Sequence, residues 1–357
     1  MSFAQDRNND FFVSSCVHTG IPLLTPDNIK LVHGNPMGLE LNVSCRTHGE
    51  KKWQRVYHYP EIGITFLCYD FANRSQLGQG YSIYPFVNFN ITHGQKFNLR
   101  FKVATGLGYV TKKYDPLLNP ENLVIGSHIN GFVNLRLNAQ FRLTDNFRIE
   151  TGIGMTHFSN GAMMLPNAGM NIASFDLGIG YHFNSQNIKL TPDTSTSPCE
   201  HFHIVTYASM GINSISRTDH TEYLSAVYSV NLERFKGNKS KWNTGLEIVY
   251  SDSRLHEIRR DTSIHNYKNI ENTQVGLKIG YAFVVGRVSV PVEMGAFIYS
   301  RPNDGIFFHR IGIRYQFSDH FIACVTLKTQ WAVAYFFEWG IGYTFPIGKG
   351  YHCSSPY

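Results

Sequence analysis

The sequence of 357 residues has few charged side chains, and no apolar run in it could cross a membrane as a helix. Charged residues make up 16% of the chain, below the ~25% of a typical soluble domain, whereas aromatic residues reach 14%. The densest apolar run, 331–337, falls far short of the ~20 residues that a membrane helix needs. These absences exclude a helical membrane protein and a disordered chain. A water-soluble β protein or a transmembrane barrel, in which only alternate residues need be apolar, fits what remains.

Neither the basic residues nor the cysteines form a recognisable motif. The net charge is only +6, and no block of Lys and Arg is longer than two or three residues, which argues against nucleic acid as a partner. The six cysteines include no Cys-x-x-Cys pair, which argues against a structural zinc, and their disulfide pairing is not readable from spacing. We therefore expect no metal ion and no organic cofactor.

The N-terminal residues contain no complete signal peptide. Met1–Asp6 lack a charged region followed by an apolar segment, although Ser2–Ala4 resemble the end of a cleavage site. Because a barrel must be exported to reach an outer membrane, we interpret this start as that of a trimmed or misassigned secretory precursor.

Apolar residues alternate strictly with polar or small residues at many places, which predicts strands with two different faces. The alternation is clearest over 97–109, 133–143 and 173–183, where Arg and Lys occupy several of the second positions. A water-soluble sheet would also alternate. However, segments of ten or more residues with aromatic ends match the ~9 to 11-residue strands and interfacial girdles of a membrane barrel. The sequence therefore predicts an all-β, antiparallel transmembrane β-barrel.

The pattern predicts two sets of eight strands separated by a polar linker. The first set covers 10–20, 37–46, 62–71, 80–91, 97–113, 131–143, 147–159 and 172–183, and the second covers 201–214, 222–235, 241–251, 273–284, 287–299, 306–317, 320–332 and 334–346. Phe175–Phe183 shares six of nine residues with Phe337–Phe345, which indicates a duplication. We expect residues 1–183 and 201–357 to be two eight-stranded units joined by 184–200, closed as two small barrels or as one barrel of ~16 strands.

One segment between two clear strands carries residues capable of chemistry. His157 and Ser159 continue the apolar parity of 147–155, so both should point toward lipid, where polar groups are rare and usually functional. A His two residues from a Ser on one face can take its proton for attack on an ester carbonyl, and Asn160 or Asn167 could stabilise the oxyanion. The same residues are also compatible with a strand end that enters a turn.

The segment resembles the active-site stretch of the lipid A 3-O-deacylases of the PagL type, which are outer-membrane barrels that hydrolyse an ester-linked acyl chain of lipid A. The resemblance rests on His-Phe-Ser-Asn at 157–160 and Pro-Asn-x-Gly at 166–169. It extends upstream less closely and covers roughly residues 30–183. The second half of the chain shows only the similarity expected of a repeat.

The resemblance implies a role for each residue of the motif. His157 would be the general base and Ser159 the nucleophile, and Asn167 with the backbone near Ala162 would form the oxyanion hole. The orienting acid of the family falls on Asn171, which is a departure. An amide can hold an imidazole, but it cannot stabilise the imidazolium as an anion would.

The function implied is that of a Gram-negative outer-membrane esterase acting on lipid A or lipopolysaccharide. The second unit has Trp331 near the position equivalent to the site, with no His or Ser there, so we expect it to be scaffold. The alternative is a non-catalytic barrel with a structural or transport role that kept the motif after losing the acid. The two hypotheses differ in whether Asn171 reaches His157 while Ser159 lies on its other side.

Overall fold

The structure is a computed structural model, which describes residues 10–183, 190–192, 202–217, 221–260, 269–300, 305–331 and 333–347. The chain divides into two units, and each unit contains one closed antiparallel barrel. None of the helices in the described ranges is both long and apolar enough to span a membrane.

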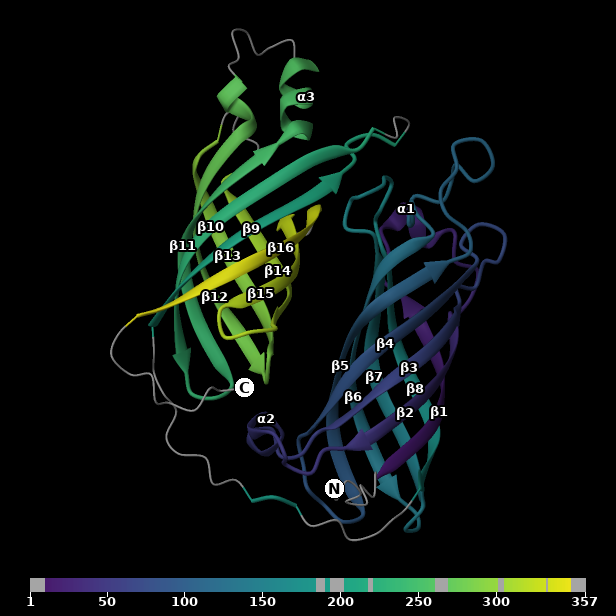
Figure 1. The fold of residues 1–357 in the computed structure, drawn as a ribbon. Helices are drawn as coiled ribbons and strands as arrows, with labels where there is room; N and C mark the ends of the chain where they lie inside the picture. The colour runs from purple at the N-terminus through teal and green to yellow at the C-terminus, as the bar shows by residue number, and fades with distance from the viewer. Residues whose placement is uncertain are drawn as a thin grey trace, which may run out of the picture. The chain divides into compact units, whose positions relative to one another are not determined.

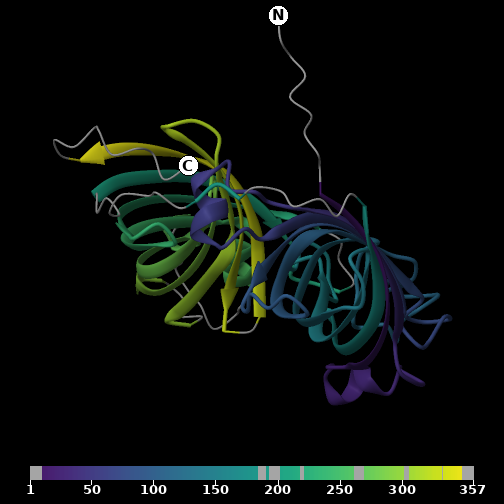
Figure 2. The same ribbon diagram turned by 90° about the horizontal axis from the view of Figure 1, so that it is seen from below.

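The first barrel consists of eight strands that follow one another around the ring in sequence order. They are β1 (Phe11–Pro22), β2 (Met37–Arg46), β3 (Glu61–Asp70), β4 (Gln79–Asn90), β5 (Phe97–Val110), β6 (Ile129–Arg142), β7 (Phe147–Ser159) and β8 (Met170–Phe183). Pairing between β8 and β1 closes the ring (Figures 1 and 2). Two short helices, α1 (Pro26–Ile29) and α2 (Lys52–Val56), lie at opposite ends of this barrel (Figure 1).

The second barrel repeats the same order with a second set of eight strands. They are β9 (Phe202–Asn213), β10 (Tyr223–Lys236), β11 (Ser240–Ser251), β12 (Thr273–Val285), β13 (Val288–Tyr299), β14 (Phe307–Gln316), β15 (Phe321–Gln330) and β16 (Val333–Ile347). The helix α3 (Asp252–Arg260) and the 3-10 turn η1 (Asn269–Asn272) precede β12. Because β16 pairs with β9, the chain forms two closed barrels of eight strands, and the alternative of one large barrel is wrong.

Exposed and buried side chains alternate along each strand, so one face of the strand lies on the exterior of the barrel and the other faces its interior. On β7, Ile153 and Met155 lie on the exterior, with 62% and 42% of their surfaces exposed, whereas Arg148 and Glu150 are buried inside. An apolar exterior and a polar interior are what lipid surroundings demand of a barrel. An eight-stranded barrel is only just wide enough for its own side chains to fill.

Ion pairs fill the middle of the first barrel. Glu40 is completely buried, and its carboxylate accepts hydrogen bonds from Arg136 at 2.5 Å and from Lys102 at 2.7 Å. The hydroxyl of Tyr84 donates a third hydrogen bond to it at 3.0 Å. Arg136 also lies 3.3 Å from the carboxylate of Asp176, whereas the described residues give Lys102 no anion other than Glu40. Lys102 therefore depends most on Glu40, because a buried charge without a partner is strongly destabilising.

We predict that Glu40→Ala lowers the free energy of unfolding by about 3 to 5 kcal/mol, since it leaves two buried cations without their shared anion. The matched control is Glu50→Ala, which removes an exposed carboxylate from the β2–β3 connection and should change stability little. The measurement is the temperature at which each purified barrel loses its folded mobility on a gel. Equal midpoints for the two variants would contradict this account of the interior.

Aromatic rings fill the end of the first barrel where β7 stops. Phe158 is fully buried, and its ring centroid lies 5.6 Å from that of Phe71 and 5.0 Å from that of Phe132. Gly108 makes room for it, because a Cβ there would lie 2.6 Å from Phe158 Cδ1. Since Phe158 stands between residues 157 and 159, its anchoring directs both neighbours to the exterior.

Candidate active site

His157 and Ser159 lie on the outer face of the first barrel, at the end of β7. The strand register sets His157 between Val133 of β6 and Asn171 of β8, and it sets Ser159 opposite Gly131 of β6. Both side chains are half-buried on a face that is otherwise apolar except for Thr151. His157 and Ser159 thus lie on the exterior, as the alternation along 147–159 predicts.

The imidazole of His157 is held by the amide of Asn171. The distance from His157 Nδ1 to Asn171 Oδ1 is 2.6 Å, and Asn171 Nδ2 faces the carbonyl oxygen of Gly169 at 3.5 Å. An amide oxygen can only accept, so His157 Nδ1 must donate. The neutral ring then keeps the lone pair of Nε2 for use as a base.

The hydroxyl of Ser159 is in contact with a second amide. Asn167 Nδ2 donates to Ser159 Oγ at 2.8 Å, and Asn167 Oδ1 accepts a hydrogen bond from the backbone N–H of Asn160 at 3.2 Å. The backbone thus fixes which end of the Asn167 amide faces the hydroxyl. A fixed N–H donor beside Oγ lies close to where the carbonyl oxygen of an attacked ester would become an oxyanion, which such a donor can stabilise.

The side chain of Asn160 is directed elsewhere. Its Nδ2 donates to Ser127 Oγ at 2.9 Å, in the connection between β5 and β6. A backbone hydrogen bond also joins the 160–169 turn to the β5–β6 connection, since the N–H of Gly169 donates to the carbonyl oxygen of Val124 at 2.9 Å. Sequence reasoning missed Ser127, because it lies in an irregular segment and no local motif links it to the site.

The turn after β7 contains two consecutive residues in the left-handed region. Gly161 has φ 63° and Ala162 has φ 69°. The conformation is ordinary for glycine but uncommon for alanine. Non-glycine residues held in this way are concentrated at functional sites, where the surrounding structure maintains them. The backbone N–H groups of this turn are therefore held in an unusual arrangement next to Ser159.

The described residues thus bring together His157, Ser159, Asn167 and Asn171 at one place on the exterior. Asp176 is not part of this group, since it is buried in the interior at 3.3 Å from Arg136 Nε. Within the described ranges, no three His, Cys, Asp or Glu side chains are arranged to hold a metal ion. A hydroxyl, an imidazole and an amide that orients the imidazole can together perform nucleophilic attack on an ester.

Gly169 makes room for the ring of His157. It has φ +79°, and a Cβ there would lie 2.8 Å from His157 Cε1. We predict that Gly169→Ala lowers ester hydrolysis about 10²-fold, because a shift of the imidazole of the order of 1 Å disrupts the alignment for proton transfer. The measurement is the rate of acyl release by the purified chain.

The matched control is Gly237→Ala, in the turn between β10 and β11. Gly237 has a similar φ of +72°, but a Cβ there would meet nothing within 4 Å. The two substitutions impose the same backbone strain, and only the first displaces a site residue. Similar losses of activity in both variants would mean that strain alone, and not the position of His157, is responsible.

Two family models match the chain. Residues 37–180 match the model described as lipid A 3-O-deacylase (PagL). Residues 201–347 match the model described as acyloxyacyl hydrolase, C-terminal domain. A search of curated proteins finds no match.

The chain is also similar to several solved structures. A crystal structure of the outer membrane enzyme PagL matches with 15% identity and a TM-score of 0.33, over 46% of this chain and 97% of that one. Neisserial surface protein A matches with 12% identity and a TM-score of 0.31, over 48% of this chain and 95% of that one. The toluene transporter TodX of Pseudomonas putida matches with 8% identity and a TM-score of 0.18, over 96% of this chain and 90% of that one.

Proposed function

We propose that the chain, which belongs to the family of lipid A 3-O-deacylases of the PagL type, is an outer-membrane serine esterase that removes an ester-linked acyl chain from lipid A. The observation that carries the proposal is the 2.6 Å contact between His157 Nδ1 and Asn171 Oδ1, with Ser159 on the same outward face. The contact prepares a base beside a hydroxyl on the surface that lipid reaches.

In the first half of the reaction, Ser159 Oγ attacks the carbonyl carbon of the ester. His157 Nε2 takes the hydroxyl proton as the bond forms, and Asn171 Oδ1 holds the opposite side of the ring through Nδ1–H. The carbonyl oxygen becomes an oxyanion, which the amide of Asn167 and the N–H groups around Ala162 would stabilise.

Collapse of the tetrahedral intermediate then breaks the bond between the acyl carbon and the sugar oxygen. His157 gives its proton to that oxygen, so the sugar leaves as an alcohol and the acyl group remains esterified to Ser159. Water attacks this acyl-enzyme with His157 again as the base, which releases the fatty acid and restores the serine.

The position of the site explains how such a substrate would reach it. The exterior of β6 and β7 next to the site is apolar, and Val133, Leu135, Ile153 and Met155 are all exposed there. An acyl chain in the outer leaflet could lie along this face and bring its ester to Ser159 by lateral movement. A soluble pocket is not needed for a substrate that already resides in the membrane.

We assign the activity to the unit formed by residues 1–183 and propose that residues 201–357 serve as scaffold. Trp331, at the end of β15, stands near the position equivalent to His157, and its side chain is 72% exposed. An exposed Trp at a strand end is typical of the membrane interface and carries no base.

Transport through the first barrel is a poorer explanation. The ion pairs around Glu40 and the ring cluster around Phe158 fill successive levels of its interior. A barrel of eight strands leaves no water-filled path once its interior is filled in this way. The outward-facing site, rather than a channel through the interior, therefore accounts better for the proposed activity.

The test is mass spectrometry of lipid A from cells that express the chain in their outer membrane, compared with cells that carry an empty vector. We expect the lipid A of the expressing cells to lose the mass of one hydroxyacyl group. Unchanged lipid A, with the folded barrel verified by its heat-dependent mobility on a gel, would contradict the proposal.

A further inference from the structure

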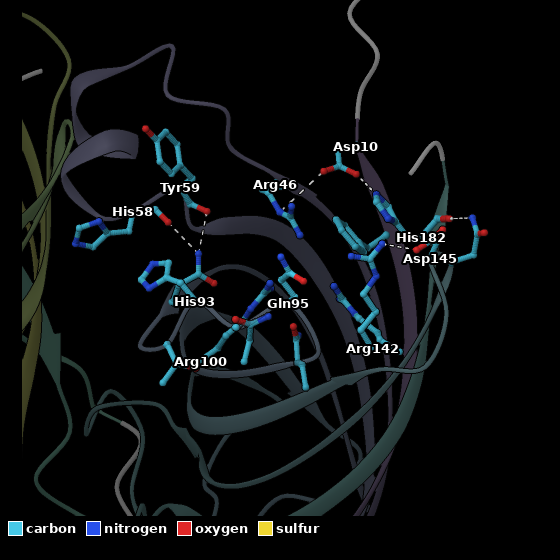
Figure 3. A pocket seen from close by; sticks show the side chains of 18 of the residues that line it. Asp10, Arg46, His58, Tyr59, His93, Gln95, Arg100, Arg142, Asp145 and His182 are labelled. Carbon is cyan, nitrogen blue, oxygen red and sulfur yellow. Dashed lines mark hydrogen bonds and ion pairs between the residues drawn. The ribbon is translucent and has the colours of Figure 1, made fainter. Parts of the chain in front are cut away.

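The first barrel has a polar cavity at the end opposite the 160–169 turn. At this end β1 begins and β8 ends, and the strands are joined by the short connections 91–96 and 143–146. Short connections are typical of the periplasmic side of outer-membrane barrels. The cavity has a volume of about 440 Å³, within the ~300 to 1,000 Å³ of small-molecule sites. Figure 3 shows the side chains that surround it.

One wall of the cavity is a long connection held in a strained conformation. The β2–β3 connection, 47–60, has 14 residues, whereas the other two on this side have six and four. His58 and Tyr59 have φ 57° and 55°, a costly pair of left-handed conformations that usually marks a functional position. Asn90 Nδ2 holds them by donating to their carbonyl oxygens at 2.9 and 3.1 Å (Figure 3).

The same connection is fastened to a segment beyond the barrel. The hydroxyl of Tyr59 donates to the carbonyl oxygen of Thr191 at 2.6 Å, and the N–H of Thr191 donates to the carbonyl oxygen of His48 at 3.0 Å. Leu190 from this segment also lines the cavity. Three separate parts of the chain therefore build and secure the rim, which a simple strand connection would not require.

The lining is rich in basic groups. It contains the arginines Arg46, Arg100, Arg142 and Arg148 and the histidines His48, His58, His93 and His182, together with the acids Asp10 and Asp145. Behind the lining, Glu61 pairs with Arg100 and Arg148, and Glu150 pairs with Arg148. Asp145 forms an ion pair with Arg142, whose Nη2 lies 2.6 Å from the Asp145 carboxylate. Arg46 makes a long ion pair of 4.0 Å with Asp10, and its guanidinium lies 5.8 Å from the ring centroid of Phe12. Its side chain is 43% exposed, so the guanidinium can still meet a ligand.

The one buried acid of the lining is already engaged by cationic or polar neighbours. The carboxylate of Asp10 contacts His182 directly (Figure 3). It also lies 4.0 Å from His48 Nε2. The ring of His182 is itself stacked on Phe12 at 4.1 Å, which fixes its position. Asp10 therefore holds basic side chains in place rather than presenting an uncompensated negative charge to the cavity.

A buried donor at the cavity remains unpaired. Arg100 is 4% exposed, and its Nη1 donates to Glu61 Oε2 at 2.6 Å. Among the described residues, Arg100 Nε and His48 Nε2 have no hydrogen-bond partner. Leaving a buried N–H unsatisfied is unfavourable by about 1 to 3 kcal/mol, and an acceptor oxygen of a ligand would remove this cost.

We propose that this cavity is a binding site for an oxyanion, namely a carboxylate or phosphate group on a small polar molecule that enters from the periplasmic side. Planar guanidinium groups match the paired oxygens of both kinds of anion. Arg46 supplies an exposed positive charge, and the buried Arg100 supplies an unpaired N–H donor. The side-chain amides around the rim could form hydrogen bonds with the rest of the bound molecule. The site is separate from Ser159 and does not depend on the proposed esterase function.

The test is calorimetric titration of the full chain, purified in detergent, with inorganic phosphate in one series and succinate in another, at constant ionic strength. We expect saturable binding with a Kd of about 1 mM or tighter for at least one of them. Arg46→Gln should weaken it about tenfold or more, and His48→Ala should weaken it also. The matched control is Arg74→Gln, an exposed arginine outside this cavity whose ion pair is with Asp70, which should leave binding unchanged.

The two titration series distinguish the sources of the anion. Tighter phosphate binding points to a phosphorylated molecule, and tighter succinate binding points to a carboxylate-bearing one. Absence of saturable binding of either anion would overturn the proposal, as would equal weakening by Arg46→Gln and Arg74→Gln. Each variant is first shown to fold by its heat-dependent mobility, and His48→Ala gives a second reading if Arg46→Gln does not fold.

Discussion

Ser159→Ala is expected to lower the rate of acyl release by about 10⁴-fold or more, since the substitution removes the atom that attacks the ester and leaves only binding and oxyanion stabilisation. The side chain is half-buried on the outer face and contributes nothing to the interior of the barrel. The loss should therefore appear in the rate and not in folding. The measurement is fatty acid released per unit time by the purified chain in mixed micelles of lipid A and detergent.

The matched control for this substitution is Ser15→Ala. Ser15 also lies on the outer face of the first barrel, on β1, and is half-exposed. Loss of its hydroxyl should leave the rate unchanged. If Ser159→Ala retains more than about a tenth of the activity, Ser159 is not the nucleophile.

Asn171→Ala is expected to lower the rate about 10²-fold or more, because His157 then loses the acceptor that fixes its tautomer and orientation. Both ring nitrogens of His157 could then carry the proton, and the ring could rotate away from Ser159. Unchanged activity in this variant would show that His157 is positioned by other groups.

The reverse substitution at the same position distinguishes orientation from charge. Asn171→Glu places a carboxylate beside His157 Nδ1, where it would stabilise the imidazolium that forms during attack. We expect the rate to rise about tenfold, which corresponds to about 1.4 kcal/mol of transition-state stabilisation. A carboxylate variant slower than the unaltered chain would mean that this site depends on an uncharged orienting group.

The strands could be predicted from the sequence because alternation is a local property. Every predicted strand overlaps an observed one, and the ends differ by at most three residues, as at 97–113 against Phe97–Val110. Closure into two rings could not be predicted in the same way. It depends on pairing between residues as distant as Phe11 and Phe183, and alternation says nothing about which strand edge meets which.

The exterior position of His157 and Ser159 followed from parity, and the register of β7 and β8 brings Asn171 opposite His157. The attachment of Asn160 to Ser127 was not predictable, since the two residues are 33 positions apart and meet only when the β5–β6 connection folds over the turn. The cavity at the other end was missed for the same reason. Its lining residues come from strands and connections spread from Asp10 to Leu190.

The most direct test of the central claim is covalent trapping with an alkyl fluorophosphonate, followed by mass spectrometry of the digested chain. The phosphonate reacts with a serine only when a base activates its hydroxyl, so it reports on the pair of His157 and Ser159 without requiring lipid A. We expect one adduct, on Ser159, and no adduct in His157→Ala. An adduct on another residue, or unchanged labelling of Ser159 in His157→Ala, would contradict the central claim.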